Sequence, residues 1–290
     1  MRVITIVKVI LLAQLLMANN AFGAFGDIVK TYELGTDDSE LGMLRPISIA
    51  CGDGYLWILD GNETKHSEFY CTFYKCQEKI TDGEYLAVLQ SFDIKYYTRN
   101  DINGFSFVTE NSQKYIWTTL TRCHQLNQLN LDSQYDIDTG VTTHRELYLP
   151  TEYWPTSITL DNNLNIYFLD GITRIIYKIN YSVYQNITGH LDVSEGNIIQ
   201  LFEVPESPLI PMGIQYILGI PGFFYITLAG ENDYIIKVNM QGQEITKKDL
   251  HQQQLPEKIS RMPTDLDIDS QGYIWFLDCD YDRLYRMSTS

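Results

Sequence analysis

The chain has 290 residues, of which 44% are hydrophobic, and carries a formal net charge of −16 at pH 7. This composition supplies enough apolar material for a sizeable buried core. The acidic residues are scattered rather than gathered into a tail, so a disordered acidic segment is not indicated. Nucleic acid and anionic membranes are disfavoured as partners, because their phosphates would be repelled.

The first 23 residues predict a cleaved secretory signal peptide. Arg2 and Lys8 make its start basic, Val9–Ala18 is apolar, and small residues surround Gly23. The apolar stretch is shorter than the roughly 20 residues that a membrane span needs. The alternative to a cleaved signal peptide is an uncleaved membrane anchor. Loss of its two basic residues makes the net charge −18. We therefore expect a secreted, extracellular mature domain over 24–290 with no membrane span.

The next segment, "GDIVKTYELG" at 26–35, predicts a β-strand, and from residue 46 onward one phrase recurs. Its best copies are "PTSITLDNNLNIYFLD" at 155–170 and "PTDLDIDSQGYIWFLD" at 263–278. The copies open at Pro46, Gly104, Pro155, Pro211 and Pro263, which are 58, 51, 56 and 52 residues apart. This period indicates a repeat fold.

Each copy predicts one antiparallel sheet of four strands. A short alternating strand is followed by a turn, an aromatic-rich strand, a third strand and a looser fourth strand, such as 84–93 or 197–204. The predicted repeats lie near 46–103, 104–154, 155–210, 211–262 and 263–290. Because the last copy stops after three strands, we expect 26–35 to supply its fourth strand and close a ring.

The pattern P-x-x-I-x-x-D-x-x-G-x-[IL]-[WY]-x-x-D resembles the NHL-type propeller repeat, and the resemblance covers residues 26–290. It implies an all-β, five-bladed β-propeller, with six blades as the alternative because that family more often has six. The family includes enzymes, scaffolds and binding modules, so the resemblance implies an architecture rather than an activity.

Alternation along the first strand of each copy predicts which residues face the central channel. The predicted core set is Ile49, Phe107, Ile158, Ile214 and Leu266. The predicted channel sets are Ser48, Ser106, Ser157, Gly213 and Asp265, followed by Ala50, Val108, Thr159, Gln215 and Asp267. We expect no cofactor, because these sets contain only two carboxylates. Asp265 and Asp267 are the candidate ligands if the protein instead binds calcium, which prefers six to eight oxygens.

The insertion at 61–74 distinguishes the first repeat from the others. Loops on a rigid scaffold often carry binding function, so this segment is a candidate binding site. Its aromatic residues, together with one nearby tyrosine, predict a contact surface for a protein or carbohydrate. The predicted binding residues are Tyr55, Phe69, Tyr70, Phe73 and Tyr74. Packing of these rings against their own blade is the alternative.

Three of the five cysteines, Cys71, Cys123 and Cys279, fall between second and third strands and are predicted to lie on one face. Cys71 could form a disulfide bond with either of the others if the geometry allows it. Cys51 and Cys76 are predicted to pack as small hydrophobes. N-glycosylation in a suitable host is predicted by three sequons, at Asn62, Asn180 and Asn186.

The sequence favours a secreted, non-catalytic interaction module that binds a protein or carbohydrate through one loop face. One alternative is a metal-dependent hydrolase, lactonase or lyase that uses the central channel. Another is a structural glycoprotein of a secreted matrix. Motifs of the G-x-S-x-G, H-E-x-x-H, C-x-x-C or phosphate-loop type do not occur in the sequence.

Overall fold

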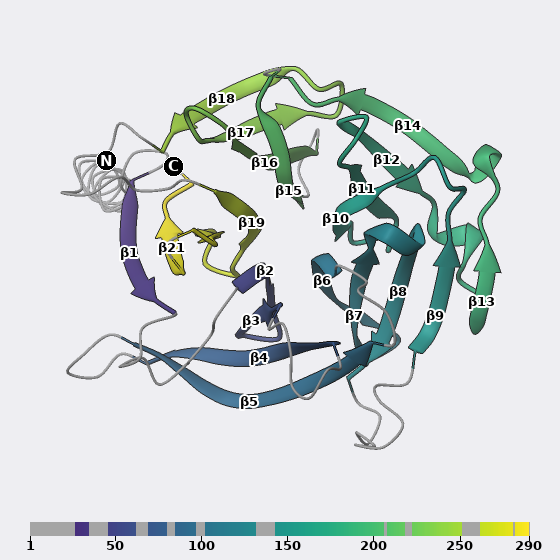
Figure 1. Cartoon of the computed structure of the whole chain (residues 1–290), viewed down its shortest axis with the longest axis horizontal. Helices are drawn as coiled ribbons and strands as arrows, with labels where there is room; N and C mark the ends of the chain where they lie inside the picture. Colours follow the sequence, from purple (N-terminus) through teal and green to yellow (C-terminus); the bar gives the residue numbers. More distant parts are fainter. Residues whose placement is uncertain are drawn as a thin grey trace, which may run out of the picture.

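Five sheets surround a central axis in the computed structural model of the chain, and the protein is a five-bladed β-propeller (Figure 1). The structure describes residues 27–34, 46–61, 69–79, 85–96, 102–131, 143–205, 208–217, 222–250, 262–280 and 282–289. The predicted signal peptide, the sequon at Asn62 and part of the insertion lie outside the described residues.

Each blade is one antiparallel sheet of four strands, and blade 2 carries a fifth strand. Blade 1 contains β2 (Pro46–Gly52), β3 (Tyr55–Asp60), β4 (Phe69–Lys79) and β5 (Tyr85–Tyr96). Blade 2 contains β6 (Ile102–Glu110), β7 (Gln113–Leu120), β8 (Gln125–Asn130) and β9 (Thr143–Tyr148), with β13 (Gly189–Asp192) added. Blade 3 contains β10 (Pro155–Leu160), β11 (Ile166–Asp170), β12 (Ile175–Ile179) and β14 (Ile198–Glu203).

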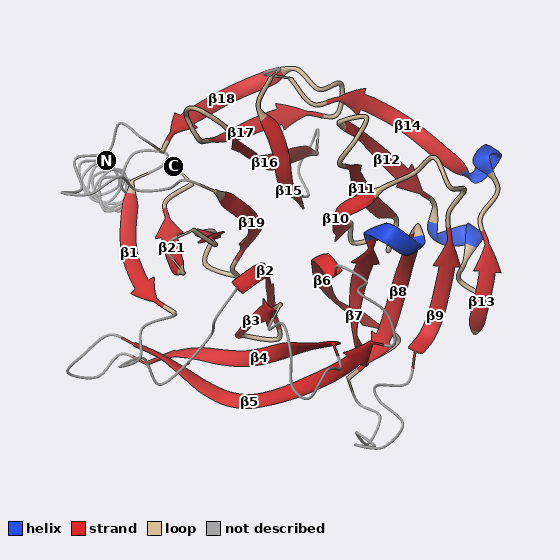
Figure 2. Cartoon of the chain, viewed as in Figure 1, coloured by secondary structure: helices blue, strands red, loops and turns tan. Residues whose placement is uncertain are grey.

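Blade 4 contains β15 (Ile210–Ile217), β16 (Phe223–Ala229), β17 (Tyr234–Asn239) and β18 (Glu244–Asp249). Blade 5 contains β19 (Pro263–Ile268), β20 (Ile274–Asp278), β21 (Arg283–Met287) and, as its outer strand, β1 (Ile28–Glu33). Figure 2 shows three short 3-10 helices between strands, η1 (Thr121–Cys123), η2 (Tyr181–Val183) and η3 (Glu195–Asn197). Within the described parts of the chain, no helix has the length and apolar character to cross a membrane.

The N-terminal strand closes the ring, as the sequence predicts. Strand β1 pairs antiparallel with β21, and the N–H of Leu34 donates to the carbonyl of Asp282 at 2.7 Å. An equivalent backbone hydrogen bond ends the fourth strand of blade 3, where the N–H of Val204 donates to the carbonyl of Arg174 at 2.8 Å. The first strands then contact one another in the order β2, β6, β10, β15 and β19, and β19 returns to β2.

The register corrects the predicted alignment of blade 2. Ile102 pairs with Leu120 as Pro46 pairs with Asp60, so Ile102 and not Gly104 occupies the anchor position. The alignment of blade 2 therefore shifts by two residues. Phe105 replaces the predicted core residue Phe107, and Gly104 and Ser106 replace Ser106 and Val108 at the two inward positions. The prediction fails here because the first strand of blade 2 lacks the anchoring proline.

The inward residues of the first strands join neighbouring blades rather than lining an open channel. Ser48 Oγ accepts the N–H of Phe105 at 3.0 Å, and Ser157 Oγ accepts the N–H of Ile214 at 3.0 Å. At Gly104 a Cβ would stand 2.7 Å from Ser157 Cα, which is too close for any side chain. We conclude that this ring of residues is a packed structural element.

Two features of the blades are not predicted from the sequence. The segment between the third and fourth strands of blade 3 crosses to blade 2, where β13 pairs in parallel with β9. The last part of the insertion in blade 1, from Phe69 onward, is strand, since β4 starts there and pairs with β5 over its whole length.

Candidate functional site

Asp265 and Asp267 on β19 bind the backbone of blade 1 instead of facing solvent. Asp265 accepts hydrogen bonds from the Ser48 hydroxyl and from the N–H of Ile49, and Asp267 accepts the N–H of Cys51 at 2.6 Å. The two residues are 2% and 6% exposed. Burial raises the pKa of Asp265 to about 8 and that of Asp267 to about 7, against the opposing effect of their hydrogen-bond donors.

This arrangement does not fit a calcium centre. Calcium takes six to eight oxygen ligands, whereas both carboxylates here are buried and hold the junction between blades 5 and 1. No three His, Cys, Asp or Glu side chains in the described residues are grouped closely enough to hold a metal ion. We therefore derive no metal-assisted step from Asp265 and Asp267.

The aspartates that end second strands stabilise turns. Asp170 accepts the N–H groups of Trp154, Ile172 and Thr173, and Asp278 accepts that of Asp280. These bonds satisfy the backbone where the chain reverses, which is a structural role that Asp commonly has in turns.

The structure does not bring the five predicted aromatic residues together. Tyr55 begins β3, whereas Phe69 and Tyr70 begin β4 at the opposite end of the same blade. Phe73 is fully buried and packs edge-on against Phe105, with ring centroids 5.1 Å apart. Tyr74 is partly buried against the cluster of apolar residues between blades 5 and 1.

The predicted disulfide bonds are not present among the five cysteines, all of which lie in described residues. Cys71 and Cys123 pack against the same apolar cluster between blades 1 and 2, and Cys279 lies in the turn after β20. Cys51 and Cys76 contact the apolar cluster between blades 5 and 1, as predicted for small hydrophobes.

Two of the three sequons can be compared in the structure. Asn186 is exposed, and the carbonyls of its neighbours Gln185 and Ile187 accept hydrogen bonds from Arg145. Asn180 is half-buried at the start of η2, and its carbonyl accepts the N–H of Val183. Asn186 is the more accessible acceptor.

If the protein is secreted from a glycosylating host, Asn186→Gln is expected to remove a glycan that Asn180→Gln leaves in place. The measurement is the mobility shift of each variant after enzymatic deglycosylation. Equal shifts for wild type and Asn186→Gln would contradict this expectation.

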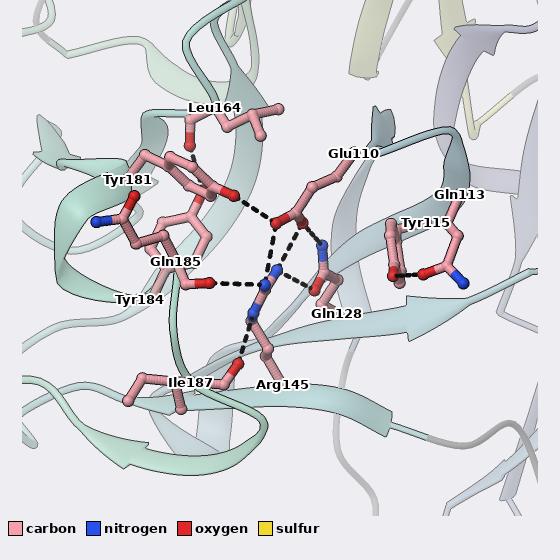
Figure 3. Close-up of polar contacts among 10 residues, drawn as sticks. All are labelled: Glu110, Gln113, Tyr115, Gln128, Arg145, Leu164, Tyr181, Tyr184, Gln185 and Ile187. Carbon is pink, nitrogen blue, oxygen red and sulfur yellow. Dashed lines mark hydrogen bonds and ion pairs between the residues drawn. The ribbon is translucent and has the colours of Figure 1, made fainter.

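A buried ion pair within blade 2 is hydrogen-bonded to the segment that follows β12 of blade 3 (Figure 3). Arg145 on β9 donates to both carboxylate oxygens of Glu110, at 2.6 and 3.0 Å, and to the Gln128 side chain at 2.7 Å. The Tyr181 hydroxyl of η2 also donates to Glu110, at 2.6 Å. Burial by itself raises the pKa of Glu110, but the bonds from Arg145, Tyr181 and Gln128 outweigh it and lower the pKa to about 2.

Replacement of Glu110 by Gln is expected to destabilise the fold by about 3 kcal/mol, because it leaves the Arg145 charge buried without its partner. The wild-type stabilisation is present above the unfolded carboxyl pKa of about 4.3 and is lost as pH falls toward 2. Urea unfolding at pH 7 and pH 3 measures both effects. If the free energies of unfolding of wild type and Glu110→Gln differ by the same amount at pH 7 and at pH 3, the assignment is contradicted.

In several blades a cation lies over an aromatic residue in, or directly before, the second strand. The cations are Lys75, Lys237 and Arg286 on the third strands, and they lie 3.8, 3.8 and 3.9 Å from the ring centroids of Tyr55, Phe223 and Tyr273. In blade 2 the corresponding residue is Gln128, which pairs with Trp117 as Arg286 pairs with Trp275. These contacts are worth roughly 0.5–2 kcal/mol each.

A pocket of about 400 Å³ opens between blades 5 and 1, beside the turns that join first to second strands. We call it the seam pocket. Its lining includes buried Leu56, Cys76 and Trp275, the partly buried Cys51, and the polar Arg286 and Gln271. Tyr55, one of the predicted binding residues, also lines it. Burial raises the pKa of the Cys76 thiol to about 12, and mainly burial raises that of Cys51 as well, so both thiols are protonated at neutral pH.

Arg286 is the cation in the wall of the seam pocket, whose lining also includes Asp53 and Asp269. Its guanidinium donates to Gln271 Oε1 at 2.6 Å and lies 3.5 Å from a carboxylate oxygen of Asp269. Asp269 in turn accepts the indole N–H of Trp275 at 2.8 Å and two backbone N–H groups of its own turn. The wall of the pocket is therefore held in place by the turn after β19.

Sequence reasoning misses this pocket because its residues come from two ends of the chain. The recurring Trp or Tyr of the second strands is visible in the sequence, but the residue that packs on it from the next blade is not. A comparison of the repeats at the position of Cys51 is the signal that could have located the pocket.

Comparisons with known proteins support the fold. No protein-family model and no curated protein sequence matches the chain. A family AA12 carbohydrate-active enzyme from Trichoderma reesei, solved with calcium, is 11% identical with a TM-score of 0.53, covering 92% of this chain and 97% of that one. A structural genomics protein of unknown function from Bacteroides thetaiotaomicron is 12% identical with a TM-score of 0.50, covering 91% and 73%. Neighbours of this kind are β-propellers, so the comparisons establish the architecture and, at these identities, no activity.

Proposed function

We propose that this protein is a secreted, non-catalytic binding module whose partner, a protein or a carbohydrate, places one of its groups in the seam pocket. The observation that carries the proposal is the pocket itself, which combines an apolar floor with a buried cation. Its volume lies within the roughly 300–1,000 Å³ range of ligand sites. The carboxylates on the axis, by contrast, are occupied by bonds to blade 1.

The proposal includes export and glycosylation, because the basic and apolar N-terminal segment and the exposed Asn186 sequon favour them. A partner with positively charged groups around its contact would complement the acidic surface. Scaffolds of this kind commonly bind through turns that project from rigid blades.

The test uses glycan and peptide arrays probed with the mature wild-type protein and with Cys51→Phe, which fills the seam pocket. We expect at least one class of ligand to bind the wild type and to lose most of its signal with the variant. Binding that is insensitive to Cys51→Phe would overturn the placement of the site. Esterase or lactonase turnover that needs stoichiometric calcium and is lost in Asp267→Asn would overturn the non-catalytic reading.

A further inference from the structure

Each second strand presents a large aromatic residue to the next blade, and in three of the five seams, within the described residues, a ring from that blade covers it. The pairs are Trp57 with Phe107 at 5.9 Å and Tyr167 with Tyr216 at 4.9 Å, both stacked, and Trp117 with Tyr184 at 5.3 Å, edge-on. A ring from the next blade therefore covers the second-strand aromatic residue in most of these seams. Trp275, the second-strand aromatic residue at the seam pocket, stacks on Tyr32 of its own blade, with ring centroids 5.7 Å apart.

Cys51 takes the position of Phe107 and Tyr216 in the seam between blades 5 and 1. It lies two residues after the core residue Ile49, as Phe107 follows Phe105 and Tyr216 follows Ile214. The short thiol side chain leaves room beside Trp275, and both residues line the seam pocket.

The seam between blades 2 and 3 shows what fills such a space. There Trp117 packs in one cluster with Ile166, Ile179 and the buried ring of Tyr184. In the seam pocket the same three framework positions are Trp275, Leu56 and Cys76, since Leu56 pairs with Cys76 as Ile166 pairs with Ile179. The two seams thus have equivalent apolar residues at these three positions, and in the seam between blades 2 and 3 the ring of Tyr184 packs against them.

The charges differ between the two seams in a way that defines the ligand. Around Tyr184 the Glu110 carboxylate is held by Gln128 and Arg145. In the seam pocket, register places Arg286 at the position of Gln128 and Lys30 at that of Arg145. The neutral Gln271 contacts Arg286 where Glu110 contacts Gln128, and Asp269 lies 3.5 Å from the same guanidinium. Asp53, on the rim, is paired with Lys114 at 2.5 Å.

We propose that the seam pocket binds an aromatic ring that carries a carboxylate, with the ring placed as Tyr184 is and the carboxylate near Arg286. This inference rests on the proposed function and names the chemistry of its ligand. A free aromatic acid and a protein chain that ends in tyrosine both present this chemistry. Arginine is suited to such a group because its planar donors match a carboxylate.

The test measures binding by isothermal titration calorimetry with the mature protein and three small probes. N-acetyl-L-tyrosine has both the ring and the charge, its amide lacks the charge, and N-acetyl-L-leucine lacks the ring. We expect the first to bind about tenfold or more tightly than either of the others. Equal affinity for the three probes, or no binding of the first, would overturn the inference.

Two variants and a matched control locate the binding. Cys51→Phe supplies the ring that Phe107 supplies elsewhere, and Gln271→Glu, at an exposed position, places a carboxylate beside Arg286. Each is expected to weaken N-acetyl-L-tyrosine binding about tenfold, while Asn163→Asp, in the corresponding turn of blade 3, leaves it unchanged. Binding that survives both pocket variants would overturn the inference.

A fourth arm separates the two sources of the ligand. This arm uses a peptide that ends in tyrosine. If the peptide binds more tightly than N-acetyl-L-tyrosine and C-terminal amidation removes this gain, the ligand is the end of a protein chain. If the two affinities are equal, the ligand is a free aromatic acid. If ligands found on the arrays respond to Cys51→Phe but contain no aromatic acid, the proposed function stands and only this inference fails.

Discussion

Deletion of residues 27–34 is expected to abolish cooperative folding of the propeller, with residues 1–26 retained so that export is not affected. The deletion removes β1, leaves the edge of β21 unpaired and exposes the surface that Tyr32 and Leu34 cover. Loss of two buried side chains at about 2 kcal/mol each, together with a row of strand bonds, is comparable with the 5–15 kcal/mol that stabilises a typical domain. Thermal unfolding followed by circular dichroism measures the effect.

The control for this deletion is a rearranged chain in which residues 27–34 follow residue 289 through a short flexible linker. Because β1 and β21 are adjacent and antiparallel, a hairpin of this kind restores the fourth strand of blade 5. We expect the rearranged chain to regain a sharp transition. A deleted chain that unfolds as sharply and at the same temperature as wild type would show that β1 does not close the ring.

Asp265→Asn is expected to make the protein more stable than wild type at pH 8 and to flatten the dependence of its stability on pH. Burial raises the folded-state pKa of Asp265 to about 8, whereas an unfolded aspartate has a pKa of about 3.9. Between these values the folded state holds a proton that the unfolded state has released, so wild-type stability falls as pH rises from about 4 to 8. Asparagine keeps an oxygen acceptor for Ser48 and Ile49 without the ionisable group.

Asp265→Ala separates the hydrogen bonds from the charge. It removes both bonds to blade 1 and is expected to destabilise the protein by about 2 kcal/mol at pH 5. Ser157→Ala, the matched change in blade 3, removes one acceptor and leaves the pH dependence as in wild type. Denaturant unfolding from pH 5 to 8 measures the free energy of unfolding of all four proteins. If this free energy changes with pH in Asp265→Asn as steeply as in wild type, the assignment is refuted. A smaller pH dependence that remains in Asp265→Asn is attributed to Asp267.

The functional assignments depend on contacts between residues that are far apart in the chain. Asp265 and Asp267 stand out in the sequence as the carboxylates of the first strands, and the sequence predicts that they face a channel. Their partners Ile49 and Cys51 come from the other end of the chain and turn them into structural residues. The buried pair of Glu110 and Arg145 has no signal in the sequence, because β9 and the end of β6 meet only in the folded blade.

The sequence by itself determined the repeat and predicted the closure of the ring, because strand alternation and turn residues act locally and recur at similar intervals, and the structure decided for five blades over six. Only the tertiary structure decided the register of blade 2, where Ile102 replaces the anchoring proline. It also decided the contents of each seam, because Tyr184, which packs on Trp117, belongs to another blade, as does Cys51, which leaves a pocket beside Trp275. Packing between blades depends on the shapes of side chains brought together from distant repeats, and a periodic pattern does not encode them.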